Sequence, residues 1–304
     1  MDVSVQNQSE PSLRELLKDC PIKARLSGKL SGRMVPDREP NQVGRWSLVE
    51  AVKHANLMIN AGATIIDIGG ESTRPGAQDV SIEEELRRTI PVIEALAARV
   101  PIPIGIDTSK PEVMRAAVAA GAGMINDVYG LRREGALDAA AELGVPVVLM
   151  HMLGEPRTMQ ANPEYGDVVG EVHRFLAERI FAAEMAGIDK KKIVVDPGFG
   201  FGKSARHNLQ LLAQLQRFTE LGVPVLAGLS RKKTIGELTG REDPRERIFG
   251  SLAAHLIAAQ RGAMLLRVHD VAATVDALKV WDAVAAVPMP RKDAGTPAIR
   301  WPDD

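Results

Sequence analysis

The stretch Ile193-Val-Val-Asp-Pro-Gly-Phe-Gly-Phe-Gly-Lys203 joins a short apolar strand to a glycine-rich loop. The β-branched run ends at the carboxylate of Asp196, and glycines then occupy positions 198, 200 and 202. In a parallel α/β protein the carboxyl ends of the strands form the ligand-binding face, and glycines let the backbone approach a ligand closely. Asp196 is therefore a candidate ligand-binding residue, although an ordinary turn between a strand and a helix would explain the same pattern.

Short apolar strands alternate with longer amphipathic helices on both sides of this stretch. Strands are predicted at 64–68, 102–106, 124–128, 145–150, 193–195, 223–227 and 264–268, and a weaker first strand falls within 25–35. Helices are predicted at 47–60, 81–100, 111–119, 135–143, 167–186, 208–221, 245–260 and 271–287. Eight strand–helix units over about 250 residues favour a single-domain α/β fold, a (β/α)8 TIM barrel, over an open doubly wound sheet.

Composition divides the chain into three parts. Residues 1–20 are predicted to form a polar N-terminal tail, 21–287 the barrel domain, and 288–304 a proline-rich C-terminal tail. Within the barrel domain the segment 21–46 is irregular, with basic residues scattered among glycines, serines and prolines.

The overall composition limits the possible partners. A net charge of −1 gives no global field that would attract nucleic acid or a membrane surface. Cys20 is the only cysteine, which excludes an internal disulfide and a cysteine-rich metal site. The sequence contains no apolar run of the roughly 18 residues that a transmembrane helix needs, and its start does not resemble a secretory signal. We expect a cytoplasmic protein that acts on small molecules.

Polar side chains follow nearly every predicted strand. They are Asp67, Thr73, Arg74, Asp107, Asn126, Asp127, His151, Asp196, Ser230, Arg231, Lys232, Arg267 and His269. Core packing does not require polar groups at these positions, and in a barrel they would meet at one rim. Asp67 and Asp127 are equally explained as acids that cap loop amides, and His151 is better explained as a structural histidine.

This set combines two kinds of ligand chemistry. Two carboxylates, an amide and an ammonium suit a flat heterocycle with several donors and acceptors: Asp107, Asp196, Asn126 and Lys232. Arg267 and His269 lie two residues apart on one strand, so both face the same side and suit a phosphate or pyrophosphate group. Thr73 and Arg74 could hold the same anion. The residues therefore indicate group transfer from a phosphorylated heterocycle.

Seven motifs resemble those of the dihydropteroate synthase family, in the same order along the chain. They are Gly-Gly-Glu-Ser-Thr-Arg-Pro-Gly (69–76), Ile-Asp-Thr-Ser-Lys-Pro (106–111), Ile-Asn-Asp-Val (125–128), Leu-Met-His-Met (149–152), Asp-Pro-Gly-Phe-Gly-Phe-Gly-Lys (196–203), Ser-Arg-Lys (230–232) and Arg-Val-His-Asp (267–270). The similarity covers residues 47–287. The glycine-rich and Ser-Arg-Lys motifs together distinguish the chain from the related pterin-dependent methyltransferases.

The resemblance implies a barrel enzyme of folate biosynthesis, a sulfonamide target that forms homodimers. It would join 6-hydroxymethyl-7,8-dihydropterin diphosphate to 4-aminobenzoate and release pyrophosphate, assisted by Mg²⁺. It implies pterin binding by Asp107, Asn126, Met150, Asp196 and Lys232, of which Asp107, Asp196 and Lys232 would be catalytic. It implies contacts with the diphosphate and aminobenzoate by Thr73, Arg74, Phe201, Ser230, Arg267 and His269.

The first loop departs from the family pattern. The family has Asn-x-Thr-Pro-Asp-Ser-Phe-Ser-Asp-Gly-Gly after its first strand, whereas this chain has Leu30-Ser-Gly-Arg-Met-Val-Pro-Asp-Arg-Glu-Pro-Asn-Gln-Val-Gly44. If Pro36 aligns with the family's proline, Arg33 occupies the position of the magnesium-binding asparagine, so the metal ligands of this chain are unknown. Three alternatives stay open: a variant in which Arg33 replaces the cation, a non-catalytic or weakly active pterin-binding paralogue, and a locally altered reading frame.

Overall fold

The computed structural model describes residues 25–31, 33–34, 45–46, 48–73, 77–154, 159 and 163–287, the first three of these ranges as backbone. The predicted tails at 1–20 and 288–304 lie outside the described residues, as does most of the segment 21–46. The domain boundaries therefore stay predictions.

Strands and helices alternate along the described chain. The principal strands are β1 (Arg25–Ser31), β4 (Ile65–Gly69), β5 (Ile104–Asp107), β6 (Met124–Asp127), β7 (Val147–Met150), β8 (Ile193–Asp196), β9 (Val225–Ala227) and β10 (Ala263–Val268). The helices are α2 (Leu48–Asn60), α3 (Ile82–Ala97), α4 (Pro111–Ala119), α5 (Ala136–Leu143), α6 (Val168–Met185), α7 (Ala205–Ala213), α8 (Lys233–Thr239), α9 (Ile248–Gln260) and α10 (Val271–Ala285). Short 3-10 turns lie at η1 (Lys190–Lys192), η2 (Leu215–Leu221) and η3 (Pro244–Glu246).

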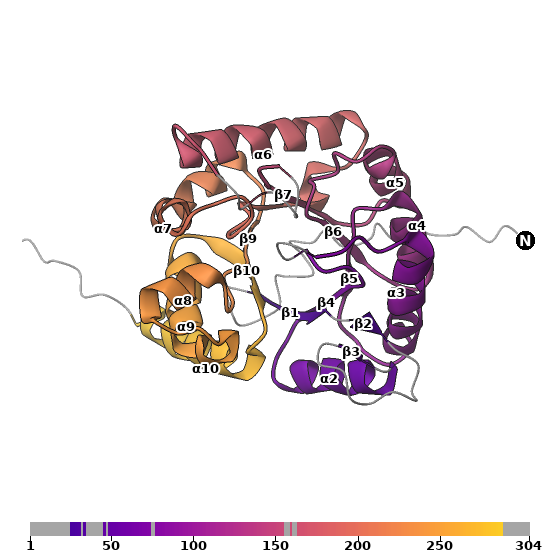
Figure 1. Cartoon of the computed structure of the whole chain (residues 1–304), viewed down its shortest axis with the longest axis horizontal. Helices are drawn as coiled ribbons and strands as arrows, with labels where there is room; N and C mark the ends of the chain where they lie inside the picture. The colour runs from indigo at the N-terminus through magenta and orange to yellow at the C-terminus, as the bar shows by residue number, and fades with distance from the viewer. Residues whose placement is uncertain are drawn as a thin grey trace, which may run out of the picture.

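The principal strands form one parallel sheet with helices around it (Figure 1). Neighbouring strands follow the order β1-β10-β9-β8-β7-β6-β5-β4, and β1 also pairs with β4, which closes the sheet. A separate two-stranded sheet joins β2 (Arg33–Met34) to β3 (Arg45–Trp46). The predicted α/β fold with a parallel sheet is confirmed. Helix α8 was not predicted, because its seven residues include Gly236 and give too short a pattern.

Two apolar cores lie on the two sides of the sheet. The core inside the closed sheet consists of Ile65, Met124, Val148, Val194, Leu226 and Leu265. The larger core lies between the sheet and the helices and includes Ile66, Ile125, Leu149, Val195 and Leu266. Successive strand residues thus face opposite sides, as the two-residue period of a strand requires. No helix in the described part of the chain is long and apolar enough to cross a membrane.

The backbone makes room for large interior side chains at two glycines. A Cβ added to Gly105 would lie 3.1 Å from Oδ1 of Asp67 and 3.1 Å from Cε of Met124. A Cβ added to Gly228 would lie 3.2 Å from Nη2 of Arg267. Glycine at these interior positions therefore leaves space for the charged groups beside them.

We expect Gly105→Ala to lower the free energy of unfolding by about 1–3 kcal/mol, the usual cost of overpacking a core. Asp67 is held by other side chains and has little freedom to move away. Gly123→Ala is the matched control, because a Cβ there meets no atom within 4 Å. Urea denaturation of both variants measures the difference, and equal stabilities would show that Gly105 is not needed for this packing.

Candidate active site

Polar side chains continue the interior face of the sheet beyond the apolar core. Residues two apart on a strand face the same side, so each interior apolar residue predicts the direction of the residue two positions later. The pairs are Ile65 and Asp67, Met124 and Asn126, Val148 and Met150, Val194 and Asp196, and Leu265 and Arg267. All five later residues are buried. The interior at the carboxyl end of the sheet is therefore mostly polar, with Met150 as the apolar exception, and it continues from the apolar core.

Arg267 links two of these carboxylates. Its Nη2 donates to Oδ2 of Asp196 at 3.0 Å, and its Nη1 lies 3.9 Å from Oδ2 of Asp67. Burial opposes the charge of the guanidinium, but the carboxylates of Asp196, Asp67 and Asp107 prevail and raise the pKa of Arg267. The positively charged guanidinium is therefore held inside the closed sheet, between Asp67 on β4 and Asp196 on β8.

Asn126 completes a group that we call the polar cluster: Asp67, Asn126, Asp196 and Arg267. The Nδ2 of Asn126 donates to Oδ2 of Asp67 at 3.2 Å. Its Oδ1, and Nη1 of Arg267, are buried without a hydrogen-bond partner among the described residues. Leaving such groups unpaired costs about 1–3 kcal/mol each, so the cluster is prepared for a ligand that carries both donors and acceptors.

The glycine-rich loop after β8 is held tightly against its neighbours. The Gly198 amide donates to Oδ1 of Asp196 at 2.8 Å, and the Gly200 amide donates to Oδ1 of Asn208 at 2.8 Å. Gly198 has φ of +71°, and a Cβ there would lie only 1.9 Å from the carbonyl oxygen of His151. The loop therefore requires glycine at position 198, both for the positive φ and for the close approach to His151 directly after β7.

Lys203 anchors the same loop from inside. Its Nζ contacts Nδ1 of His151 at 2.9 Å and donates to the carbonyls of Gly198 at 2.9 Å and Phe201 at 3.0 Å. Burial lowers the pKa of Lys203 to about 7. Burial, with the nearby Lys203 charge, lowers the pKa of His151 to about 2. His151 is therefore a neutral structural partner, as preferred from the sequence. Lys203 belongs to the glycine-rich motif, but the sequence analysis assigned it no role.

An apolar patch lies beside the polar cluster. Met150 and Phe201 belong to one buried group with Val128, Met152 and Met159. The Lys232 ammonium lies 4.2 Å from the centroid of the Phe201 ring, a cation–π contact. A flat heterocycle at the polar cluster could pack on this patch, with Lys232 at its edge.

The remaining predicted residues fall into separate places. Ser230 and His269 join each other, with Oγ and Nδ1 3.0 Å apart. The guanidinium of Arg267 is engaged by Asp196 and Asp67, so the joint phosphate clamp of Arg267 and His269 stays a prediction. Thr73 and Asp107 line one small cavity. Arg74 and the side chain of Arg33 lie outside the described residues.

Two strand-end residues have structural roles. Asp127 accepts hydrogen bonds from the amides of Tyr129 at 2.9 Å and Leu131 at 2.8 Å, which makes it a loop-capping acid. Arg231 donates from Nε to Oδ2 of Asp270 at 2.9 Å. Asp67, for which the sequence left both interpretations open, instead lies in the polar cluster.

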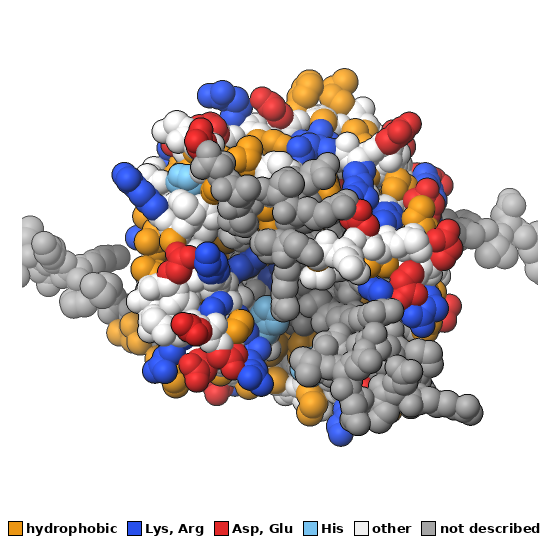
Figure 2. Space-filling model, in the orientation of Figure 1, with side chains coloured by type: hydrophobic (Ala, Val, Ile, Leu, Met, Phe, Trp, Pro, Cys, Tyr) orange, Lys and Arg blue, Asp and Glu red, His pale blue; other side chains and the backbone are white. Residues whose placement is uncertain are grey.

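The described residues contain no group of three or more His, Cys, Asp or Glu side chains that could hold a metal ion. Two of the buried carboxylates, those of Asp67 and Asp196, already interact with Arg267. Binding of Mg²⁺ by this chain stays a prediction. On the face shown in Figure 2, acidic and basic side chains are interspersed, without a field of one sign.

A buried polar cluster at the carboxyl end of a parallel sheet is typical of an α/β enzyme that binds a small molecule. Residues 35–269 match the sequence model of the pterin binding enzyme family. The chain is 58% identical over 237 residues to the dihydropteroate synthase of Escherichia coli strain K12, covering 78% of this chain and 84% of that protein.

Solved structures agree with the sequence comparison. A Xanthomonas albilineans dihydropteroate synthase with 4-aminobenzoic acid superposes with a TM-score of 0.81 at 64% identity, covering 88% of this chain and 94% of that one. The same organism's enzyme in complex with 7,8-dihydropteroate gives a TM-score of 0.78 at 60% identity, covering 88% and 96%. The chain belongs to the pterin binding enzyme family and, within it, to the dihydropteroate synthases, which are transferases.

We expect the Lys203 environment to make stability depend on pH. The pKa of Lys203 falls from 10.5 to about 7 on folding, so between these values the unfolded chain binds one more proton than the folded one. Relative to Lys203→Met, the wild type should gain about 1.4 kcal/mol of unfolding free energy per pH unit as pH rises through this window. Below about pH 7 the difference should become constant.

Urea denaturation at pH 6, 8 and 9, three values chosen about one unit or more from the ends of the window, measures this slope. Lys191→Met removes an exposed lysine from η1 and serves as the matched control. A wild type that tracks Lys203→Met at every pH would show that Lys203 stays charged in the folded protein.

Proposed function

We propose that the chain joins 6-hydroxymethyl-7,8-dihydropterin diphosphate to 4-aminobenzoate, giving 7,8-dihydropteroate and pyrophosphate. The observation that carries the proposal is the polar cluster, in which Oδ1 of Asn126 and Nη1 of Arg267 are buried beside two carboxylates. A pterin ring has donors for the carboxylates and for Oδ1 of Asn126, and it has acceptors for Nη1 of Arg267. The apolar patch of Met150 and Phe201 would cover one face of the ring.

In this proposal the amine nitrogen of 4-aminobenzoate forms a bond to the pterin methylene carbon. The bond from that carbon to the diphosphate oxygen breaks, and the amine loses a proton. Positive charge develops on the pterin as the diphosphate leaves. The buried carboxylates of Asp107 and Asp196 would stabilise this charge, because fixed groups in a dry site need no reorganisation. Lys232 would bind the pterin edge.

Several residues are proposed to bind the remainder of the two substrates. Phe201 and Ser230 would line the 4-aminobenzoate site, and the structure of the Xanthomonas albilineans relative with 4-aminobenzoic acid supports a site of this kind. Thr73, Arg74, Arg267 and His269 would contact the diphosphate or the entering amine. With Arg267 held by acids, its role in this set is to bridge the polar cluster and the diphosphate.

The magnesium requirement is part of the proposal. We infer that Mg²⁺ would enter bound to the diphosphate oxygens, as it does with many phosphorylated substrates. Neutralising those oxygens is the chemistry it would supply. Arg33, the residue aligned with the family's asparagine, belongs to the short strand β2.

We further propose the (β/α)8 TIM barrel as the fold class, with residues 21–287 as its single domain. The closed strand order and the helix after each principal strand support this assignment. A homodimer and a cytoplasmic location are also proposed. Exposed apolar side chains on the neighbouring helices α9 and α10 support a dimer, with Phe249 84% exposed and Val280 and Val284 more than half exposed.

We expect the purified chain to release pyrophosphate only when 4-aminobenzoate is present with the pterin diphosphate and Mg²⁺. Asn126→Leu should lower kcat/KM by at least about 100-fold, because the pterin would lose its amide partner inside a buried site. Asn56→Leu is the matched control, since Asn56 lies on the exposed face of α2 and donates to the Val52 carbonyl of its own helix.

Two results would contradict the proposal. The first is release that does not depend on 4-aminobenzoate. The second is normal turnover by Asn126→Leu. No release by the wild type, with pterin binding retained, would favour the non-catalytic paralogue that the altered first loop suggests.

A further inference from the structure

Lys110 contacts two carboxylates that come from different elements. Its Nζ lies 2.6 Å from Oε2 of Glu71, in the loop after β4, and also bonds Oε2 of Glu85, in the first turn of α3. The side chains are 12% exposed for Lys110, 21% for Glu71 and 0% for Glu85. Solvent screens such pairs less than surface ion pairs, so this Lys110 cluster holds its elements together more strongly.

Glu71 also closes its own loop. Its Oε1 accepts a hydrogen bond from the amide of Val80 at 3.1 Å, at the opposite end of the loop 71–80. The other oxygen of this carboxylate, Oε2, accepts a hydrogen bond from the Lys110 ammonium. Just before the loop, the Gly70 carbonyl accepts a hydrogen bond from Nη1 of Arg88 at 2.7 Å. Gly70 also packs closely on α3, because a Cβ added to it would lie 2.9 Å from Cγ of Glu85. Both ends of the loop are therefore fixed at one place.

The same cluster reaches the candidate active site. Lys110 lies three residues after Asp107, at the start of α4. Thr108, between them, hydrogen-bonds Glu85. Thr73, in the loop that Glu71 closes, lines one small cavity with Asp107 and Thr108. The Lys110 cluster therefore connects the loop that carries Thr73 with the segment that carries Asp107 and Thr108.

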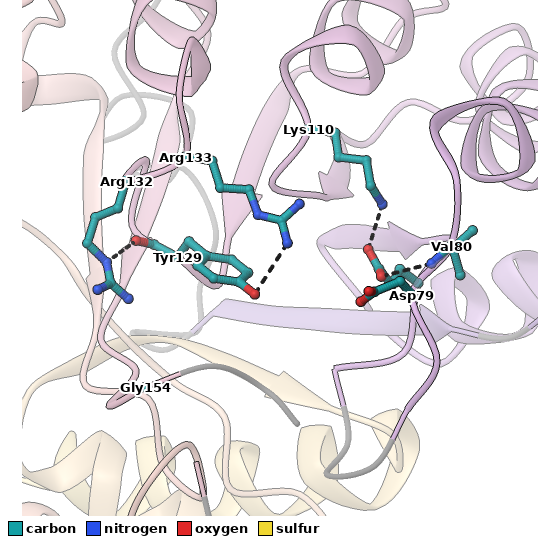
Figure 3. Close-up of a pocket in the computed structure, with 8 residues that line it drawn as sticks. Asp79, Val80, Lys110, Tyr129, Arg132, Arg133 and Gly154 are labelled. Atoms are coloured by element: carbon teal, nitrogen blue, oxygen red, sulfur yellow. Dashed lines mark hydrogen bonds and ion pairs between the residues drawn. The ribbon is translucent and has the colours of Figure 1, made fainter. Parts of the chain in front are cut away.

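The charge balance favours support of the loop over binding of an anion by Lys110. An open pocket of about 590 Å³ lies beside Lys110 and also contains Arg132 and Arg133 (Figure 3). The Lys110 ammonium is already surrounded by two carboxylates, which leaves little positive charge for a ligand in that pocket. Lys110 therefore acts on the structure through its contacts with Glu71 and Glu85.

We propose that Lys110 is a positioning residue for the second substrate, acting by holding the loop 71–80 so that Thr73 faces Asp107. The inference rests on the proposed function, because that function assigns Thr73 to the diphosphate and 4-aminobenzoate. The polar cluster is built on β4, β6, β8 and β10 without Lys110. Loss of Lys110 should therefore impair use of 4-aminobenzoate far more than binding of the pterin ring.

Two variants remove contacts of Lys110 with Glu71 and Glu85 without leaving a buried charge unpaired. Glu71→Gln keeps an acceptor for the Val80 amide but removes the ion pair with Lys110. The double variant Lys110→Met with Glu85→Gln removes the ammonium and the buried carboxylate together. Lys191→Met, at an exposed lysine on η1, is the control for loss of one lysine charge.

In both test variants we expect hydrogen exchange of the amides of Ser72, Thr73 and residues 77–80 to become about tenfold faster, which corresponds to about 1.4 kcal/mol. KM for 4-aminobenzoate should become about tenfold higher, again about 1.4 kcal/mol. Calorimetry should give an affinity for a pterin that lacks the diphosphate within about twofold of the wild-type value. This change corresponds to about 0.4 kcal/mol, less than half of the roughly 1.4 kcal/mol expected for the loop. Lys191→Met should change neither quantity.

Unchanged hydrogen exchange of these amides would show that Lys110 does not hold the loop. Faster exchange with an unchanged KM for 4-aminobenzoate would overturn the positioning role. The unmodified chain distinguishes a failure of the proposed function: without turnover that depends on 4-aminobenzoate, the substrate part of the inference is refuted too. Hydrogen exchange alone then decides whether Lys110 holds the loop.

Discussion

The interaction of Arg267 with Asp196 and Asp67 is the constraint on which the candidate active site depends. Three charged groups lie inside the closed sheet, and each is buried. Two carboxylates that close together would repel each other strongly in such an environment, and the guanidinium lowers that cost. Oδ1 of Asn126 and Nη1 of Arg267 have no hydrogen-bond partner among the described residues, so a polar ligand that pairs them would stabilise the cluster.

The two-residue period of the strands explains how this arrangement follows from the sequence. Each interior apolar residue is followed two positions later by a residue on the same face, and for Val194 and Leu265 these are Asp196 and Arg267. The glycine-rich loop then brings the Gly198 amide to Asp196, and Lys203 donates to the Gly198 carbonyl of the same loop. The α/β fold with a parallel sheet, and the strand-end positions of most members of the polar cluster, could therefore be predicted from local patterns.

Pairings between distant elements could not be predicted in this way. Asp67 could equally have capped a loop, because its partners Asn126 and Arg267 are 59 and 200 positions away in the sequence. Lys110 and Lys203 looked like ordinary motif lysines until the structure placed carboxylates or carbonyls around them. Strand β1 was only weakly indicated, since its apolar residues are few and its pairing with β4 and β10 depends on tertiary contacts.

The most direct test of the central claim is a calorimetric titration of 6-hydroxymethyl-7,8-dihydropterin diphosphate, without 4-aminobenzoate, into the wild type and Asp196→Asn. Asp276→Asn, at an exposed position on α10, is the control. The account predicts that Asp196→Asn binds about 100-fold more weakly, a loss of about 2.7 kcal/mol, while the control binds normally. Equal affinities for all three proteins would show that the polar cluster does not bind the pterin.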